Sequence, residues 1–171
     1  MANPSYLSLG NNRFREDFGF YFEDFTVGQI IEHRPGRTIT QNDNIWFTLL
    51  TMNTAQLHFD VHYAEQTEWK KPIVNSTFTL AIITGMTVNT ISKKVVANLA
   101  WDKVKLLKPV FEGDTIYAET EIKAKRESIS RPTQGIITVE TRGINQHKEI
   151  FMSFERTVLV YKKGGAPDYS I

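Results

Sequence analysis

The side chains best suited to acid/base chemistry are four histidines, His33, His58, His62 and His147. An imidazole titrates near neutrality and can exchange protons with water. His58 and His62 are four residues apart, but no HExxH pattern joins them, so the spacing predicts no metal site. With Cys at 0, the chain also has no thiolate nucleophile, disulfide framework or cysteine-based metal site.

His58 lies in a segment, residues 52–59, that breaks the helical periodicity on its N-terminal side. Asp60 follows, and its position is typical of the N-cap of a short helix over 61–66. Taken alone, a histidine in such a loop is more often a surface or capping residue than a catalyst. Asp60 is as well suited to capping a helix as to carrying a proton.

One uncharged stretch, residues 72–92, organises the elements that would hold such a site. Its large apolar residues are spread over several helical faces, which predicts a helix buried all round. The helix is expected to start near Ser76 or Thr77, with Asn75 or Ser76 as its cap. Threonines interrupt every apolar run, whereas a membrane span takes about 20 predominantly apolar residues.

A second helix is predicted just before the histidine loop. Thr40 to Asp43 has the form of a capping box, which marks a helix start. The apolar residues after it recur at helical spacing and are expected to face the core: Ile45, Trp46, Leu49 and Leu50.

Beyond Ser92 the period changes to two, which indicates strands. The predicted strands are 95–107, 115–126, 135–144 and 149–161, preceded by a short strand at 30–33 and a turn at Pro35–Gly36 before residues 37–39. Together they predict a single α+β domain over 20–161, an antiparallel sheet of about five strands wrapped around one long central helix. An irregular arm, 1–19, precedes this domain and a tail, 162–171, follows it.

Length and composition fit this picture. A chain of 171 residues fits one domain, and a formal net charge of +1 gives no reason to expect a nucleic acid or a membrane surface as partner. The N-terminus lacks the basic and apolar regions of a secretory signal. We therefore expect a cytoplasmic enzyme or binding domain.

A sheet curled around one helix is the hot-dog arrangement, and the residues around His58 carry a specific resemblance. The runs 53–60 (NTAQLHFD) and 72–76 (PIVNS) resemble the hydratase signature of the MaoC-like acyl dehydratases, whose usual form is Asp-x-Asn-Pro-Leu-His-x-Asp and then Pro-Ile-Val-His-Gly. The resemblance extends from about Phe20 to Tyr161. It is strongest to the mesaconyl-CoA hydratases, also called β-methylmalyl-CoA dehydratases, with the (R)-specific enoyl-CoA hydratases also similar.

The resemblance implies reversible addition of water across the 2,3 double bond of an enoyl-CoA thioester, with mesaconyl-CoA as a candidate substrate. His58 matches the catalytic histidine, and Asn53 and Asp60 would position the water. The backbone over Asn75, Ser76 and Thr77, at a helix head, would bind the substrate and stabilise the thioester oxyanion.

The resemblance also bears on substrate recognition, on cofactors and on assembly. Arg131, in a Ser-Arg-Pro turn, would recognise a second carboxylate on the acyl group, although an arginine in a polar turn is usually solvated. Neither a metal nor a redox cofactor is expected, and coenzyme A enters as part of the substrate. The family joins two sheets edge to edge, so at least a homodimer is expected.

Two positions depart from the family pattern. Asn53 replaces the usual aspartate, and an amide orients water but cannot exchange a proton as a carboxylate does. Ser76 stands where many members have glycine, so the oxyanion donor should sit at ordinary backbone angles.

Two alternatives stay open. A hot-dog thioesterase is disfavoured because many of those place a carboxylate on the central helix, and residues 72–92 contain none. A non-catalytic acyl-CoA binding protein that has lost its aspartate is compatible with the sequence.

Overall fold

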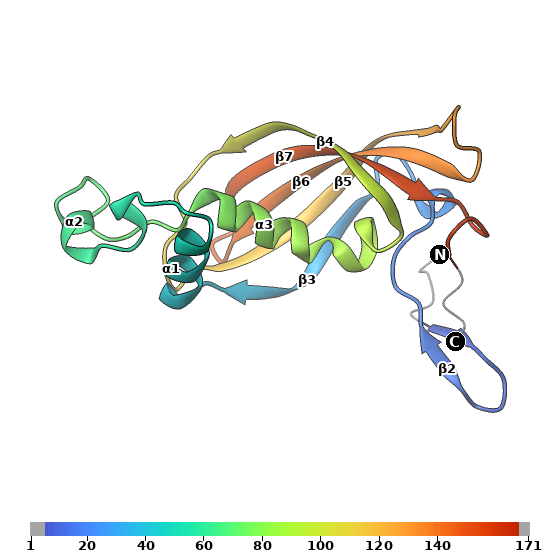
Figure 1. Cartoon of the computed structure of the whole chain (residues 1–171), viewed down its shortest axis with the longest axis horizontal. Helices are drawn as coiled ribbons and strands as arrows, with labels where there is room; N and C mark the ends of the chain where they lie inside the picture. The colour runs from blue at the N-terminus through green and yellow to red at the C-terminus, as the bar shows by residue number, and fades with distance from the viewer. Residues whose placement is uncertain (1–5, 168–171) are drawn as a thin grey trace.

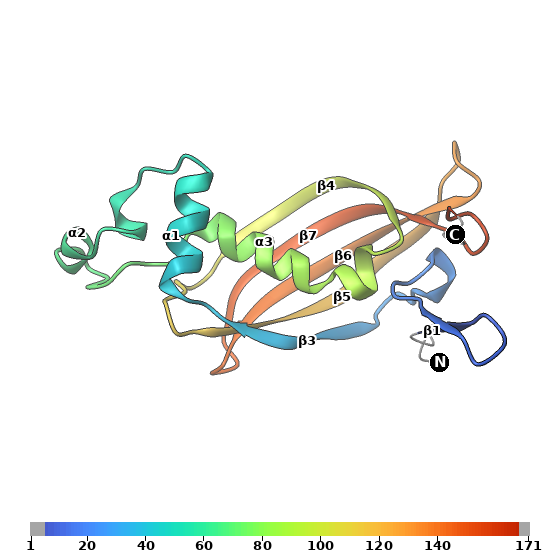
Figure 2. The same cartoon turned by 60° about the horizontal axis from the view of Figure 1, so that its bottom comes forward.

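The computed structural model describes residues 6–167. Five antiparallel strands form one sheet in the order β3-β5-β6-β7-β4, and helix α3 lies across one face of it (Figures 1 and 2). These elements are β3 (Ile30–Thr38), α3 (Ser76–Met86), β4 (Val95–Leu106), β5 (Thr115–Glu127), β6 (Gln134–Asn145) and β7 (Ile150–Tyr161). The predicted α+β architecture is confirmed, and each of the four long strands lies within one residue of its predicted bounds.

The N-terminal arm, expected to be irregular, contains a short hairpin of β1 (Tyr6–Ser8) and β2 (Phe14–Glu16). Gly10, Asn11 and Asn12 have positive φ angles of 79°, 50° and 58°. Glycine and asparagine tolerate this left-handed region, so they close the turn between the two strands. The hairpin projects from the end of the sheet opposite α2 (Figure 1).

The turn predicted at Pro35–Gly36 is wrong, because β3 runs through it as one strand. The register against β5 shifts between His33 and Arg37, so the additional residues form a bulge rather than a reversal. The Tyr117 ring packs directly against Gly36, where a side chain would collide with it.

The central helix is shorter and less buried than predicted. α3 ends at Met86, and a π-helical turn, η3 (Val88–Ser92), continues to the next strand. One side faces the sheet and is buried: Phe78, Thr79, Ile83, Thr87 and Ile91. The opposite side is exposed because the single sheet covers only one face: Thr77, Ala81 and Gly85. No helix within residues 6–167 is long and apolar enough to span a membrane.

Helix α1 (Gln41–Leu50) has the predicted capping box but the opposite orientation. Trp46, Leu49 and Leu50, expected in the core, are 76%, 54% and 81% exposed. Its buried residues are Asn44 and Thr48. The cause is the loop beneath α1, whose backbone groups need hydrogen-bond partners that only polar side chains supply.

Candidate active site

The histidine loop connects α1 to α3 at one end of the sheet. It contains a 3-10 turn, η2 (Gln56–His58), and a short helix, α2 (Val61–Glu65), which projects beyond the sheet (Figure 1). The loop returns to the body at Ile73, which forms an isolated bridge with Phe111 and whose amide donates to the Leu57 carbonyl at 3.3 Å. This return brings His58 to the head of α3.

Asn44 on α1 holds the two ends of the loop together. Its Nδ2 donates to the carbonyls of His58 (2.8 Å) and Ile73 (3.2 Å), and its Oδ1 accepts from the Asn75 amide at 2.8 Å. The Asn75 Nδ2 in turn donates to Thr48 Oγ1 at 3.3 Å. One buried polar face of α1 therefore fixes both the histidine and the start of α3.

His58 is oriented for base chemistry. Its Nδ1 lies 2.9 Å from the carbonyl oxygen of Ile73. A carbonyl only accepts, so Nδ1 carries the proton, and in the neutral ring Nε2 is then the basic nitrogen. His58 lines a cavity of about 320 Å³. No described residue hydrogen-bonds to Nε2, which leaves it able to bind water.

The head of α3 supplies the second element of the site. Asn75 is the N-cap, and its Oδ1 accepts from the Thr77 amide (3.0 Å) and hydroxyl (2.7 Å). The Asn75 amide is itself bonded to Asn44. Within residues 75–77 only the Ser76 N–H has no acceptor among the described residues, and Ser76 lines the same cavity as His58. Ser76 is not among the residues with positive φ, as expected because this position is a serine and not a glycine.

The cavity wall is mostly apolar apart from these groups. Its remaining described residues are Trp69, Ile73, Val74, Thr79, Leu106, Leu107, Lys108, Pro109, Val110, Phe151 and Met152. The ammonium of Lys108 is paired with Glu149. The wall is built from α3, the end of β4 and the start of β7, far apart in sequence. From the sequence, only the contribution of α3 to this wall could be predicted.

The other predicted site residues lie elsewhere. The Asn53 Oδ1 accepts from the Ala55 amide at 2.9 Å and braces the loop, and Asn53 does not line the cavity. The Asp60 Oδ1 accepts from the Tyr63 amide at 3.0 Å and caps α2. Their predicted contribution to positioning water stays a prediction.

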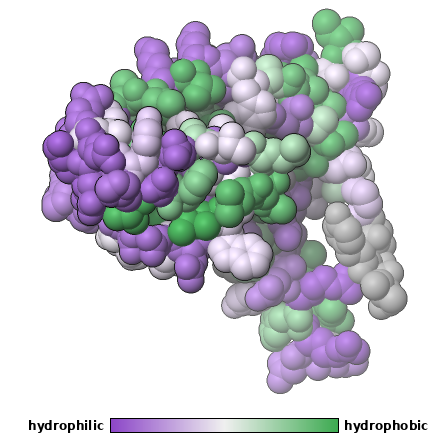
Figure 3. Space-filling model, turned by 60° about the vertical axis from the view of Figure 1, so that its left-hand side comes forward, coloured by the Kyte–Doolittle hydropathy of each residue, from purple (hydrophilic) through white to green (hydrophobic). Residues whose placement is uncertain are grey.

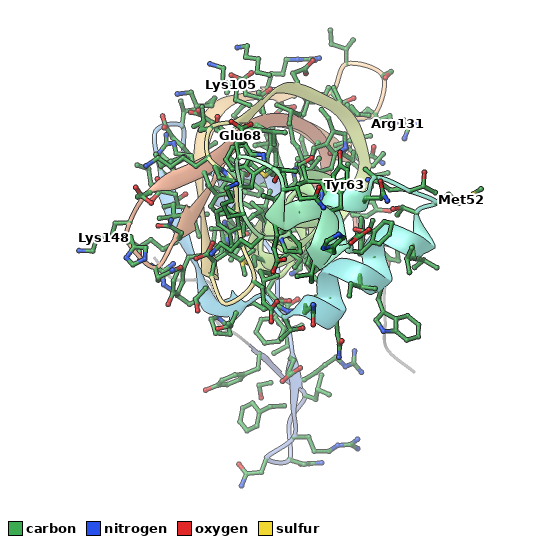
Figure 4. All side chains as sticks on the ribbon, turned by 90° about the vertical axis from the view of Figure 1, so that its left-hand side faces the viewer. Met52, Tyr63, Glu68, Lys105, Arg131 and Lys148 are labelled. Carbon is green, nitrogen blue, oxygen red and sulfur yellow. The ribbon has the colours of Figure 1, made fainter. Side chains whose placement is uncertain are left out.

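Arg131, labelled in Figure 4, belongs to the β5–β6 turn, which lies at the end of the sheet opposite α2 (Figure 1). β5 has 13 residues, so its length separates Arg131 from the His58 end by about 40 Å within one chain. A single chain therefore does not bring Arg131 to the candidate site.

Asn44 and Thr48 are the functional residues that the sequence reasoning missed. They are four positions apart and so share one face of α1. The apolar residues on the rest of the helix were read as its inner face. A pair of hydrogen-bonding side chains at i and i+4 beside an irregular loop is the signal that points to them.

A sheet around one helix, with a histidine and a helix head sharing a cavity, defines a protein of the hot-dog class. The MaoC-like domain family matches residues 23–143, which is most of the chain, and this protein belongs to that family. A solved structure described as a monoamine oxidase regulatory protein from Archaeoglobus fulgius has a TM-score of 0.75 and 32% identity, covering 84% of this chain and 95% of its own.

Two further proteins similar to this chain are about twice as long. The mesaconyl-CoA hydratase of Cereibacter sphaeroides is 32% identical over 148 residues, which are 86% of this chain but 43% of that protein. A Mycobacterium tuberculosis protein with a double hot-dog fold has a TM-score of 0.78 and 21% identity, covering 90% of this chain and 46% of its own, a likeness of fold alone. The chain thus spans less than half the length of the curated relative.

Proposed function

We propose that this protein adds water reversibly across the 2,3 double bond of an enoyl-CoA thioester, with mesaconyl-CoA among its candidate substrates. The observation that carries the proposal is that His58 and Ser76, the first residue of α3, line one cavity. Membership of the MaoC-like family and the likeness to a mesaconyl-CoA hydratase support it.

Each half of the cavity has a role in this reaction. Nε2 of His58 takes a proton from water as the oxygen attacks Cβ, and the resulting imidazolium returns a proton to Cα. The Ser76 N–H and the positive end of the α3 dipole stabilise the thioester oxygen while it carries enolate charge. Asn44 fixes the positions of these two groups relative to each other. A carboxylate-dependent thioesterase would require a carboxylate at the site, and the described cavity wall contains none.

We further propose that the working form is a homodimer joined through β4. This strand ends the sheet and is paired only on its β7 side. Apolar side chains are exposed along it and just after it: Leu99, Trp101, Val104 and Leu106, followed by Leu107. An unpaired apolar edge is a template for another strand. A second copy would replace the second half of the double-length relatives.

Enoyl-CoA absorbance on mixing with crotonyl-CoA or mesaconyl-CoA tests the activity. Loss of the double-bond signal is expected with the wild type, and His58→Ala should lower kcat by a factor of about 10²–10⁴. His62→Ala, at an exposed histidine four residues on, is the matched control and should leave the rate unchanged. Binding of CoA esters without turnover of any enoyl-CoA would refute the hydratase in favour of a binding protein.

Ser76→Pro tests the oxyanion donor without removing the helix. Proline lacks the N–H but is favoured at the first position of a helix, and Asn75, with φ −57° and ψ 124°, already has the backbone that precedes a proline. We expect kcat to fall by a factor of about 10²–10³ with stability preserved. Ser76→Ala keeps the amide and should stay near the wild-type rate. Equal activity of the two variants would exclude the Ser76 amide as the donor.

A further inference from the structure

A second cavity, of about 590 Å³, lies at the N-terminal end of β4. The first cavity, with Leu106, Leu107 and Lys108 in its wall, lies at the C-terminal end of the same strand. β4 has 12 residues, so the two cavities of one chain are about 35–40 Å apart. The wall of this second cavity is formed by the base of the N-terminal arm, the residues around the start of β4, the end of β7 and residues that follow β7.

The second cavity has the chemistry of a nucleotide site. Its described lining residues are Leu7, Arg15, Glu16, Asp17, Phe18, Tyr21, Lys93, Lys94, Val95, Tyr161, Ala166 and Pro167. Three of them are aromatic, which suits stacking of a purine, and three are cationic, which suits phosphate. The Lys94 ammonium lies 2.6 Å from Asp17 Oδ1 and 3.8 Å from the centre of the Tyr21 ring. The Lys94–Asp17 pair is neutral overall. Of the other charged lining residues, Arg15 and the exposed Lys93 are cations and Glu16 is an anion, which leaves one net positive charge for an anionic ligand.

We infer that this cavity binds the 3′-phosphoadenosine diphosphate part of coenzyme A, whose acyl group reacts at the partner subunit's His58. The inference rests on the proposed function. It supplies the substrate with a binding site that neither the histidine loop nor the head of α3 contains.

The arrangement in trans follows from symmetry. A two-fold axis pairs identical edge strands antiparallel, so the C-terminal end of β4 in one chain lies beside the N-terminal end of β4 in the other. The acyl cavity of one chain is then next to the second cavity of its partner. Within one chain the separation exceeds the reach of the pantetheine arm, roughly 15–20 Å, which is the reach of about five extended residues.

Binding of adenosine 3′,5′-bisphosphate, measured by calorimetry on the intact chain, tests the cavity independently of catalysis. We expect Arg15→Glu and Lys93→Glu each to weaken binding at least tenfold. Arg13→Glu makes the same charge change at the exposed tip of the same arm, outside the cavity, and should bind like the wild type. Wild-type affinity in both cavity variants would overturn the inference.

Mixing variants tests the arrangement in trans. Lys93→Glu alone should raise KM for the enoyl-CoA, while His58→Ala alone should lower kcat by a factor of about 10²–10⁴. In a mixed dimer one site carries both defects and the other carries none, so turnover at low substrate should rise above that of either variant. No rise would mean that each site uses its own chain's cavity, which overturns the arrangement in trans.

The two proposals fail in different ways. Bisphosphate binding that depends on Arg15 and Lys93, in a protein that turns over no enoyl-CoA, supports the nucleotide cavity while the hydratase proposal fails. Turnover with an unchanged KM in both cavity variants leaves the hydratase in place and overturns the nucleotide cavity.

Discussion

The two helices beside the candidate site bury opposite kinds of side chain. α3 turns Phe78 and Ile83 toward the sheet and leaves Ala81 in solvent, as an ordinary core helix does. α1 buries Asn44 and exposes Leu50, so most of its large apolar side chains point outward, although Phe47 packs against Phe78 in the core. α3 builds the core, whereas α1 holds the backbone of the loop that carries His58.

The difference follows from what each helix covers. The sheet beneath α3 has its backbone groups paired, so apolar side chains lose nothing by lying on it. The loop beneath α1 is irregular, and an unpaired buried carbonyl or amide costs about 1–3 kcal/mol. Asn44 alone satisfies three such groups, the carbonyls of His58 and Ile73 and the amide of Asn75. An apolar residue there would leave the His58 carbonyl and the Asn75 amide without a partner, and the Ile73 carbonyl would keep only its bond from His58 Nδ1.

The turn that follows α3 presents polar side chains toward the sheet. Thr87 Oγ1 accepts from Arg156 Nη2 at 2.8 Å, and burial lowers the pKa of Arg156 to about 10. Thr90 lies 3.2 Å from Nδ1 of His33, whose Nε2 lies 2.8 Å from Thr120 Oγ1. Burial, followed by the charges of Arg156 and Arg34, lowers the pKa of His33 from 6.5 to about 4.

The largest expected effect is therefore a loss of stability in acid through His33. Its folded pKa lies below its unfolded value, so the unfolded chain binds the proton more readily. The free energy of unfolding should be at its full value above pH 6.5 and fall as the pH drops, by about 3 kcal/mol below pH 4. Urea unfolding at pH 7, 5.5 and 4.5 measures the slope.

Two histidine variants make this measurement specific. His33→Gln should remove most of the pH dependence between pH 6.5 and 4, because its side chain does not titrate. His147→Gln, at an exposed histidine in the β6–β7 turn, should keep it. An unchanged slope in His33→Gln would show that His33 is not the group responsible.

The next effect concerns the buried face of α1. Asn44→Ala should lower the free energy of unfolding by about 1–3 kcal/mol, because buried backbone groups of the loop lose the hydrogen bonds that Asn44 makes with them. It should also lower kcat, since His58 and Ser76 lose their common anchor. Asn42→Ala, at an exposed position on the same helix, is the matched control and should change neither quantity. Wild-type turnover in Asn44→Ala would show that catalysis does not depend on the hydrogen bonds of Asn44.

The sequence was sufficient for most of the sheet but not for the orientation of α1. Strands 115–126 and 135–144 were predictable because alternation in an antiparallel sheet has one buried face. The capping roles of Thr40, Asp60 and Asn75 were predictable because they are local. The orientation of α1 was not, because periodicity shows that a helix has an apolar face without showing where the core is. The cavity wall contributed by Leu106 and Phe151 depends on strand pairing between distant segments.

The smallest effect tests whether the outer face of α1 is truly free. Apolar surface is visible next to the hydrophilic α2 end of the molecule (Figure 3), and Leu50 on α1 is 81% exposed. Leu50→Ser should therefore change the free energy of unfolding by less than about 0.5 kcal/mol. Leu159→Ser makes the same substitution at a residue only 5% exposed on β7 and should cost about 3 kcal/mol.

The value of the Leu50 measurement lies in its dependence on protein concentration. If α1 serves only the loop beneath it, the small effect of Leu50→Ser stays constant as the protein is diluted. A cost above about 1 kcal/mol that disappears on dilution would mean that another chain covers the face, since association stabilises by mass action. The outward apolar side of α1 would then be a second interface, and the contrast with α3 would hold only within the single chain.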